Sequence, residues 1–301
     1  MEETKKKSKN AIIGIVFTII VIASVSVCIW YFQVKKPHDE AVNGFNTATE
    51  TLEVKNAELD SVIADAQSLM DETNKPYDEN TMSELKVSIA DAENAKRTVP
   101  ELPSKTSDII SATKMLKEPI DYSSFIDAIK EKQSALENSI LQMRQITAPT
   151  ESFVIQRIAD VEGISGVQAV TEDHDPNGNL NKAGGYTACI YFSSSLINQD
   201  EVFGNDIVEK GTDCGGCIEV YPTIEEAEKR NTYLSAFDGA GMLDSGSHNI
   251  LGSIVIRTSR TLTATQQSEL TQKISEKLLE IIYVFLTIFL YLLKCPQSLI
   301  L

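Results

Sequence analysis

Three cysteines in the second half of the chain are the residues best suited to chemistry. Cys214 and Cys217 form a C-x-x-C pair, and Cys189 lies in a segment that we expect to be a neighbouring strand. A C-x-x-C pair serves as a redox dithiol, as half of a zinc site or as a disulfide. The pair leads into the strand-like run CIEVY instead of opening a helix, which is the wrong context for a thioredoxin-like site.

A zinc site built on this pair needs two further ligands. Cys189 supplies one, and His174 or His248 would be the fourth. The alternatives are a disulfide between Cys214 and Cys217, which an external location favours, and thiols at a strand entry that carry no function. The sequence leaves these alternatives open.

A second candidate is the run DHDPNG, which ends at Gly178 and matches the opening D-x-[DN]-x-[DN]-G of a calcium loop. In that interpretation Asp173, Asp175 and Asn177 supply alternate oxygen ligands. The twelfth position of the loop requires a bidentate glutamate, but Gly184 stands there. Because Asp-Pro-Asn-Gly also suits a tight turn between strands, we expect a turn and keep calcium as the alternative.

Other catalytic arrangements are missing from the sequence. The three histidines, His38, His174 and His248, lie far apart in the chain, and no acid can be assigned to orient His248 beside Ser247. The sequence contains no Gly-rich phosphate loop and no H-E-x-x-H motif. We therefore expect a protein that is not an enzyme and has no cofactor.

The elements that hold these residues begin with an apolar run from Ala11 to Phe32, preceded by Lys5, Lys6, Lys7 and Lys9. A hydrocarbon core of about 30 Å requires about 20 apolar residues in a helix. Aromatic residues at 30–32 suit the interface at the distal end. The excess of lysine on the amino side predicts a cytoplasmic tail at 1–10, an anchor at 11–32 and an extracellular bulk.

Two rival interpretations of the apolar run involve processing. A cleaved signal peptide would have a shorter apolar core, and its nearest cleavage candidate, at Ser24 and Ser26, has no polar break after it. A lipid-modified cysteine at Cys28 would follow the bulky Val27. The sequence favours an uncleaved anchor over both.

Composition limits the choice of partners. The chain has 301 residues, a formal net charge of −16 and 23% charged residues. An acidic surface disfavours nucleic acid, because nucleic acid attracts basic patches. The expected partners are the lipid bilayer and a cell-envelope component or another surface protein.

Residues 37–148 are expected to form a helical stalk or bundle. One seam repeats every seven residues, and a second row is offset from it by three; they comprise Val42, Thr49, Asn56, Ile63 and Met70, and Phe45, Leu52, Leu59 and Ala66. Such rows are the a and d positions of a coiled-coil-like seam. Polar seam residues favour an intramolecular bundle. Further helices are predicted before Pro100, around Ile109, and from Ser123 to Ile146.

This region resembles the FIVAR-type helical repeat of Gram-positive surface proteins. The resemblance covers 59–116 and is carried by Tyr77, Leu85, Ile89, Ala90, Ala92 and Ala95. It implies a spacer at a bacterial cell surface and transfers no functional residue.

Residues 149–277 are expected to form an α+β domain. Strands are predicted at 167–170, 186–193, 217–221 and 250–258, and helices capped by Thr223 and Thr263 follow the third and fourth of them. Because strands and helices do not alternate strictly, we predict an antiparallel sheet with helices packed on one face. The runs EVYPTIEEAEKRNTYLSAFDG and GSHNILGSIVIRTS resemble a signature of uncharacterised membrane-anchored proteins of Gram-positive bacteria. That resemblance implies location and no activity.

The last apolar segment, 278–294, is expected to contact the membrane as a second span. The alternative is a helix whose apolar continuation packs on the sheet. The whole chain is thus predicted to be an anchored extracytoplasmic protein with a binding or structural role at the cell envelope. The competing hypothesis is a thiol- or metal-dependent module built on Cys189, Cys214 and Cys217.

Overall fold

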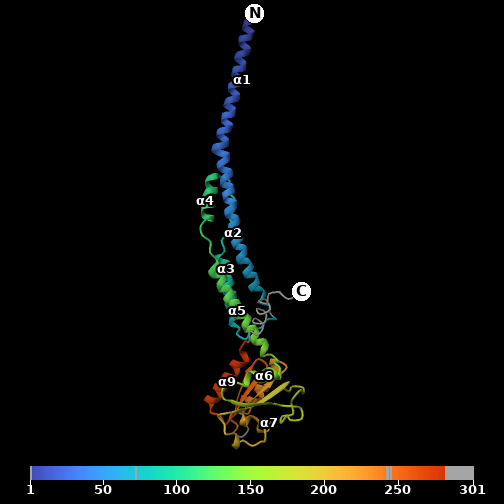
Figure 1. The fold of residues 1–301 in the computed structure, drawn as a ribbon. Helices are drawn as coiled ribbons and strands as arrows, with labels where there is room; N and C mark the ends of the chain where they lie inside the picture. The colour runs from blue at the N-terminus through green and yellow to red at the C-terminus, as the bar shows by residue number, and fades with distance from the viewer. Residues whose placement is uncertain (1, 72, 242–243, 245, 282–301) are drawn as a thin grey trace, which may run out of the picture. The chain divides into compact units, whose positions relative to one another are not determined.

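The computed structural model describes residues 2–71, 73–241, 244 and 246–281, with side chains described from Gly14 onward. Helices predominate, and the elements follow one another as Figure 1 shows. The elements are α1 (Glu2–Trp30), η1 (Tyr31–Lys35), α2 (Lys36–Ser68), α3 (Asn80–Ala95), α4 (Thr106–Leu116), α5 (Ser123–Gln145), α6 (Glu151–Ile158), β1 (Ile164–Ala169), β2 (Ala188–Ser194), η2 (Gln199–Glu201), α7 (Ile207–Lys210), η3 (Gly211–Cys214), β3 (Gly215–Val220), α8 (Ile224–Ser235), β4 (Ser247–Leu251), β5 (Ile254–Thr258) and α9 (Ala264–Leu279).

The chain divides into two compact units. The first contains residues 1–71 and 83–133, and the second contains residues 72–82 and 134–301. Two of the three boundaries fall inside helices, because α3 and α5 each contribute residues to both units. The last turns of α5 therefore belong with the α+β unit.

The first unit starts with an uninterrupted helix. From Gly14 to Ser68 the backbone stays helical for 55 residues, and its most apolar stretch has no buried residue. The π-helical turn η1, which has one extra residue per turn, joins α1 to α2 where the apolar run gives way to Lys35. Lys35 pairs with Asp39 at 2.8 Å one turn further on.

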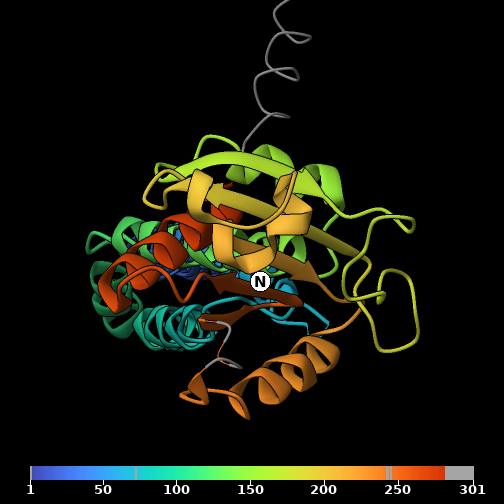
Figure 2. The same ribbon diagram turned by 90° about the horizontal axis from the view of Figure 1, so that it is seen from below.

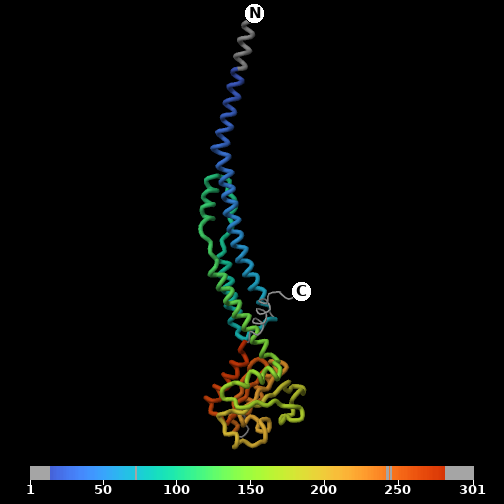
Figure 3. The backbone as a smooth tube through the Cα atoms, in the orientation of Figure 1, coloured from blue at the N-terminus to red at the C-terminus, as the bar shows by residue number. Residues whose placement is uncertain are grey.

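The second part of this helix packs against α4, and Figure 3 shows the two running side by side. The predicted row at Phe45, Leu52, Leu59 and Ala66 is buried throughout, which confirms that it faces a core. In the other predicted row Ile63 is buried, and the remaining members are only partly covered. The core between α2 and α4 contains Phe45, Ala48, Leu52, Ile109 and Leu116.

A cluster of hydrogen-bonded polar groups holds α2 against the rest of the first unit. The Asn56 amide donates to the carbonyl of Arg97 at 2.9 Å, and its Oδ1 accepts from the Tyr122 hydroxyl at 2.9 Å. The same hydroxyl accepts from the backbone N–H of Arg97. The Arg97 guanidinium donates to the carbonyl of Met115 in the last turn of α4 and to that of Glu118 just after the helix. Asn56, a polar interruption of the seam in the sequence, thus fixes the position of α2.

The second unit is built on a five-stranded sheet of order β1-β2-β3-β5-β4, with every neighbouring pair antiparallel. This confirms the predicted α+β class and antiparallel sheet. The predicted caps are also present: Thr223 accepts from the Glu226 N–H, and Thr263 forms a full capping box with Gln266.

Helices cover both faces of the sheet, which corrects the expectation of helices on one face only. On one face α6 and α9 pack against Ile190, Ile218 and Ile256. On the other face Ala227 and Leu234 of α8 pack against β2, β3 and β5. Figure 2 shows α8 (orange) and α9 (red) on opposite sides of the strands. Because β2, β3 and β5 are buried at every position, their sequences could not reveal which face is covered.

The predicted strand at 250–258 is two strands, β4 and β5, joined by a tight turn. Gly252 has a φ of +59°, and a Cβ there would lie 2.5 Å from the carbonyl oxygen of Ile146. Ser253 completes the turn by donating its N–H to Ile146 and accepting from the Ala148 N–H. Contact with the end of α5 therefore folds the segment into a hairpin. Residues 282–294 of the predicted second membrane segment lie outside the described residues.

Candidate functional site

A buried carboxylate lies at the centre of a polar cluster in the α+β unit. Glu219 of β3 has no exposed surface. Its Oε1 accepts from Arg257 Nη1 at 2.8 Å and from Arg230 Nη2 at 2.9 Å. Its Oε2 accepts from Arg230 Nε at 2.8 Å and from the Tyr221 hydroxyl at 2.9 Å. Both oxygens are therefore satisfied by charged or hydroxyl donors.

The sheet register explains why these groups meet. Residues opposite one another in an antiparallel sheet share a face, so Cys217 lies in one row with Tyr191 and Arg257. Glu219 lies in the next row on the same face, opposite Cys189. This is the face that α8 covers, and α8 brings Arg230 onto the carboxylate.

The cluster determines the protonation of its acid. Burial is the strongest single influence on the Glu219 carboxyl and raises its pKa, but hydrogen bonds and charge from Arg230 and Arg257 together outweigh it. The pKa of Glu219 is therefore lowered, and the group is a carboxylate at neutral pH. Because two guanidinium groups pair with one carboxylate, the buried cluster carries a net positive charge.

Two of the three predicted thiols belong to this cluster. Cys217 Sγ lies 3.9 Å from Glu219 Oε1 and 3.9 Å from Arg257 Nη1. Its thiol is also the hydrogen-bond partner of Cys189, and this contact, followed by burial, raises the pKa of Cys189 well above its usual value. Both are free thiols with no exposed surface. Their residues are diagonal neighbours in the register, an arrangement less close than the direct pairing that disulfide geometry favours.

The third thiol is positioned by different atoms. Cys214 ends η3, and its Sγ lies 3.1 Å from the carbonyl oxygen of Gly211 and 3.4 Å from that of Phe192. Burial raises the pKa of Cys214 to about 11. Cys214 and Cys217 are both free, so the C-x-x-C spacing does not form a disulfide in this structure.

In the predicted calcium loop, the Asp175 carboxylate accepts hydrogen bonds from its own loop and from Tyr186. Asp175 Oδ2 accepts from the N–H groups of Asn179 and Leu180, and Oδ1 accepts from the N–H of Asn177 and the hydroxyl of Tyr186. The Asn177 amide donates to Tyr191 Oη at 3.1 Å, while Asp173 is exposed. The geometry supports the predicted turn and gives no support to calcium binding by Asp173, Asp175 and Asn177.

Another set of potential metal ligands was not predicted. Within the described residues, His174, Asp206 and Glu209 are the one set of three such side chains whose ligand atoms all lie within 4.8 Å of one another. Cys189, Cys214 and Cys217 do not form such a set. Nothing in the sequence indicated that these three residues meet, because Asp206 and Glu209 follow His174 by more than 30 residues.

The remaining histidines have structural partners. His248 lies between Asn231 Oδ1 at 2.7 Å and Asp238 Oδ1 at 3.0 Å, and its side chain is largely covered. His38 contacts the Thr106 hydroxyl in the first unit. Ser247 precedes His248 on β4, and neighbouring side chains on a strand point to opposite faces. These contacts do not assemble a nucleophile with a base.

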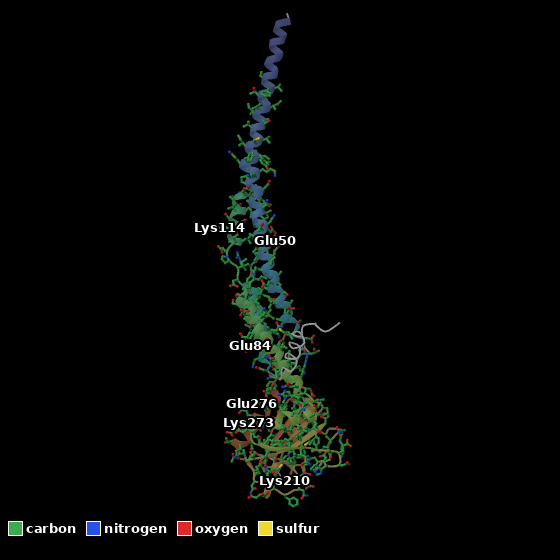
Figure 4. The ribbon with its side chains drawn as sticks, in the orientation of Figure 1. Glu50, Glu84, Lys114, Lys210, Lys273 and Glu276 are labelled. Carbon is green, nitrogen blue, oxygen red and sulfur yellow. The ribbon has the colours of Figure 1, made fainter. Side chains whose placement is uncertain are left out.

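An open groove of about 910 Å³ is the largest hollow described on the α+β unit. Its lining includes Glu162, Lys273, Glu276 and Lys277, and it runs along the exposed side of α9. Lys273, labelled in Figure 4 beside Glu276, pairs with Glu162 at 2.7 Å. A lining with both signs of charge suits a polar ligand or a protein surface.

Comparison with known proteins adds no identification. No family model, no curated protein and no solved structure matches this chain. Its class is therefore defined by its own architecture: an α+β protein whose N-terminal helix is long and apolar enough to cross a membrane.

Proposed function

We propose that this chain is a membrane-anchored extracytoplasmic protein, in which the helical unit serves as a stalk and the α+β unit has a binding or structural role at the cell envelope. The observation that supports it most is the exposed apolar helix. Large side chains such as Ile15, Phe17 and Ile22 are 61%, 67% and 59% exposed. Burying a side chain of this size in an apolar medium is worth about 1.5–3 kcal/mol, so a run of them strongly favours a bilayer.

The orientation in this proposal rests on charge. Lysines precede the apolar run in the sequence, and the described helix continues past the run as α2. The positive-inside rule then places the tail in the cytoplasm, and it places the part of the first unit after the apolar run and the whole second unit outside. The two resemblances to Gram-positive surface proteins imply the same location.

Membrane attachment is tested by charging the apolar helix. A double variant Ile19→Lys, Ile22→Lys introduces two charges whose cost at the centre of a membrane helix is about 2.5–3.5 kcal/mol each. We expect the parent chain to stay in the membrane pellet after an alkaline carbonate wash and the double variant to be released. Val54→Lys is the matched control, because Val54 is an exposed apolar residue further along α2. Release of the control as well, or retention of the double variant, would contradict anchoring by this helix.

The mass of the mature protein separates an anchor from a leader sequence. An uncleaved anchor retains the whole apolar run, whereas a signal peptide cleaved near Ser24 or Ser26 would be lost together with the apolar residues before that point. We expect the membrane-extracted chain to retain it. A mature mass that lacks the first 24 to 30 residues would overturn the anchor.

The binding role is assigned to the groove along α9. We expect the external region, taken as residues 35–281 so that it contains the whole of α9, to co-sediment with isolated cell envelope from the producing organism. The double variant Lys273→Ala, Lys277→Ala should lose this binding, because both lysines line the groove. The matched control Lys86→Ala, Lys114→Ala changes the same charge in the first unit. Equal binding by both double variants would mean that the groove along α9 is not the binding surface.

A further inference from the structure

We propose that His174, Asp206 and Glu209 form a binding site for one first-row transition-metal ion of the Zn²⁺ class. His174 lies in the loop after β1, Asp206 caps α7, and Glu209 belongs to α7. His174 Nε2 is 3.0 Å from Asp206 Oδ2, and all three ligand atoms lie within 4.8 Å of one another. This site shares no residue with the cysteines or with the oxygen ligands of the calcium motif.

The donor set selects the class of metal. One imidazole nitrogen and two carboxylate oxygens are ligands that Zn²⁺ accepts at about 2.0–2.2 Å, with water in a fourth tetrahedral position. Calcium and magnesium favour sets made of oxygen alone. A loaded site requires ligand atoms about 3.4 Å apart, as follows from those bond lengths. His174 Nε2 and Asp206 Oδ2 lie 3.0 Å apart, so they would move apart by about 0.4 Å to admit the ion, and the exposed Glu209 side chain would move inward.

Each carboxylate has one oxygen held by a neighbour and one oxygen left for the ion. Asp206 Oδ1 accepts from the Glu209 N–H at 2.9 Å and lies 3.3 Å from His174 Nε2, while Oδ2 lies 3.0 Å from that nitrogen. Glu209 Oε2 accepts from the backbone and side-chain nitrogens of Asn205 at 2.8 and 2.7 Å, which leaves Oε1. Metal-binding carboxylates are commonly oriented by such outer hydrogen bonds.

The two ligand-bearing segments are fixed without the ion. The His174 N–H donates to the carbonyl of Thr171, and the next residue, Asp175, holds its loop through backbone N–H groups. The start of α7 is held by Gln168 of β1, whose Oε1 accepts from the N–H groups of Ile207 and Val208. The ion therefore meets prepared ligands, and it would connect the loop after β1 to α7.

The net charge of the set also favours a divalent cation. Two carboxylates and a neutral imidazole carry two negative charges, which one divalent ion neutralises. The nearest cation in the segment, Lys210, directs its ammonium to the carbonyl of Gln199 at 2.8 Å instead of to the carboxylates.

The test is calorimetric titration of the detergent-solubilised full chain with ZnCl₂, with a Co²⁺ absorption spectrum as a second readout. We expect one ion per chain, and at least about tenfold weaker binding in both His174→Ala and Glu209→Gln. His38→Ala and Glu201→Gln are matched controls that should bind like the parent. Near-ultraviolet circular dichroism of the metal-free variants shows whether each still folds.

Three results would overturn the site. The first is no saturable Zn²⁺ binding by the parent chain, which would leave only an ion pair. The second is binding that His174→Ala and Glu209→Gln do not weaken. The third is an intense sulfur-to-cobalt charge-transfer band, which would place the ion on the cysteines.

Discussion

The guanidinium of Arg257 on β5 lies 2.8 Å from the carboxylate of Glu219 on β3 in the interior of the α+β unit. Both strands are buried at every position, so the pair is shielded from water. Arg230 brings a second guanidinium to the same carboxylate from α8. The carboxylate thus links β3, β5 and α8, and its removal would leave two arginines without their anion. Buried groups of this kind are costly when one partner is lost.

We predict that Glu219→Gln destabilises the α+β unit by about 3–5 kcal/mol, because the substitution keeps the shape and removes the charge that both arginines require. Urea unfolding of the detergent-solubilised chain, followed by near-ultraviolet circular dichroism of the buried tyrosines, measures this loss. Glu228→Gln on the exposed side of α8 is the matched control and should change stability by no more than about 0.5 kcal/mol. Equal effects of the two variants would show that the cluster contributes little.

The same carboxylate predicts a dependence of stability on pH. Burial alone would raise the pKa of Glu219, but Arg230 and Arg257 outweigh it and lower that pKa in the folded state. An unfolded glutamate titrates at about pH 4.3. The stabilisation from this group is therefore complete above that pH and is lost as the pH falls through the lower folded value.

The urea midpoint of the parent chain should thus fall more steeply below about pH 4.3 than that of Glu219→Gln. Other carboxylates, such as Asp175, contribute to both proteins and cancel in the difference. Parallel pH profiles of the two proteins would mean that Glu219 is not ionised in the folded state.

We predict that Cys189, Cys214 and Cys217 remain unreactive thiols in the folded chain. All three have no exposed surface, which denies a reagent access to their sulfur atoms. Burial also raises the pKa of Cys214 to about 11, so little of that thiol is thiolate at neutral pH. In a variant with serine at Cys28 and Cys295, a disulfide reagent should titrate no thiol before urea unfolding and three afterwards. A folded chain with one reactive thiol and a mass two hydrogens lighter would instead indicate a disulfide and revive the redox hypothesis.

In the first unit we predict that Tyr122→Phe costs about 1–3 kcal/mol of stability. The substitution removes the hydroxyl that bridges Asn56 and the backbone of Arg97, and it leaves both polar groups without that partner. Far-ultraviolet circular dichroism during urea unfolding reports the helices of this unit. Tyr77→Phe, at a residue that is 42% exposed, is the control. A variant as stable as this control would mean that solvent replaces the bridging hydroxyl without cost.

Local patterns in the sequence predicted much of the fold. The row through Leu52 and Leu59 repeats with the helical period and is buried, and the Thr263 capping box is readable from four consecutive residues. The hairpin of β4 and β5 was missed because its turn depends on Gly252 meeting the carbonyl of Ile146, more than 100 residues away. Local periodicity carries no information about such a contact.

The same limit applies to the polar sites. Glu219 and Arg230 stand 11 residues apart on different elements, and only the sheet register brings Arg257 to them. Asn56 in a helical seam looked like a weakness, and its partner Tyr122 lies 66 residues away. The C-x-x-C motif, in contrast, was conspicuous in the sequence, but its two cysteines form no disulfide with each other. The thiol of Cys217 contacts that of Cys189 instead of that of Cys214.

The central claim is an anchor at the apolar run with everything after that run outside the cell, and labelling with a membrane-impermeant maleimide tests it most directly. In the background with serine at Cys28 and Cys295, Ser104→Cys places one reactive thiol at an exposed position of the first unit, and Ser8→Cys places one in the predicted tail. The account predicts that Ser104→Cys is labelled in intact cells and that Ser8→Cys is labelled only after lysis. Labelling of Ser8→Cys in intact cells, with Ser104→Cys protected until lysis, would contradict it.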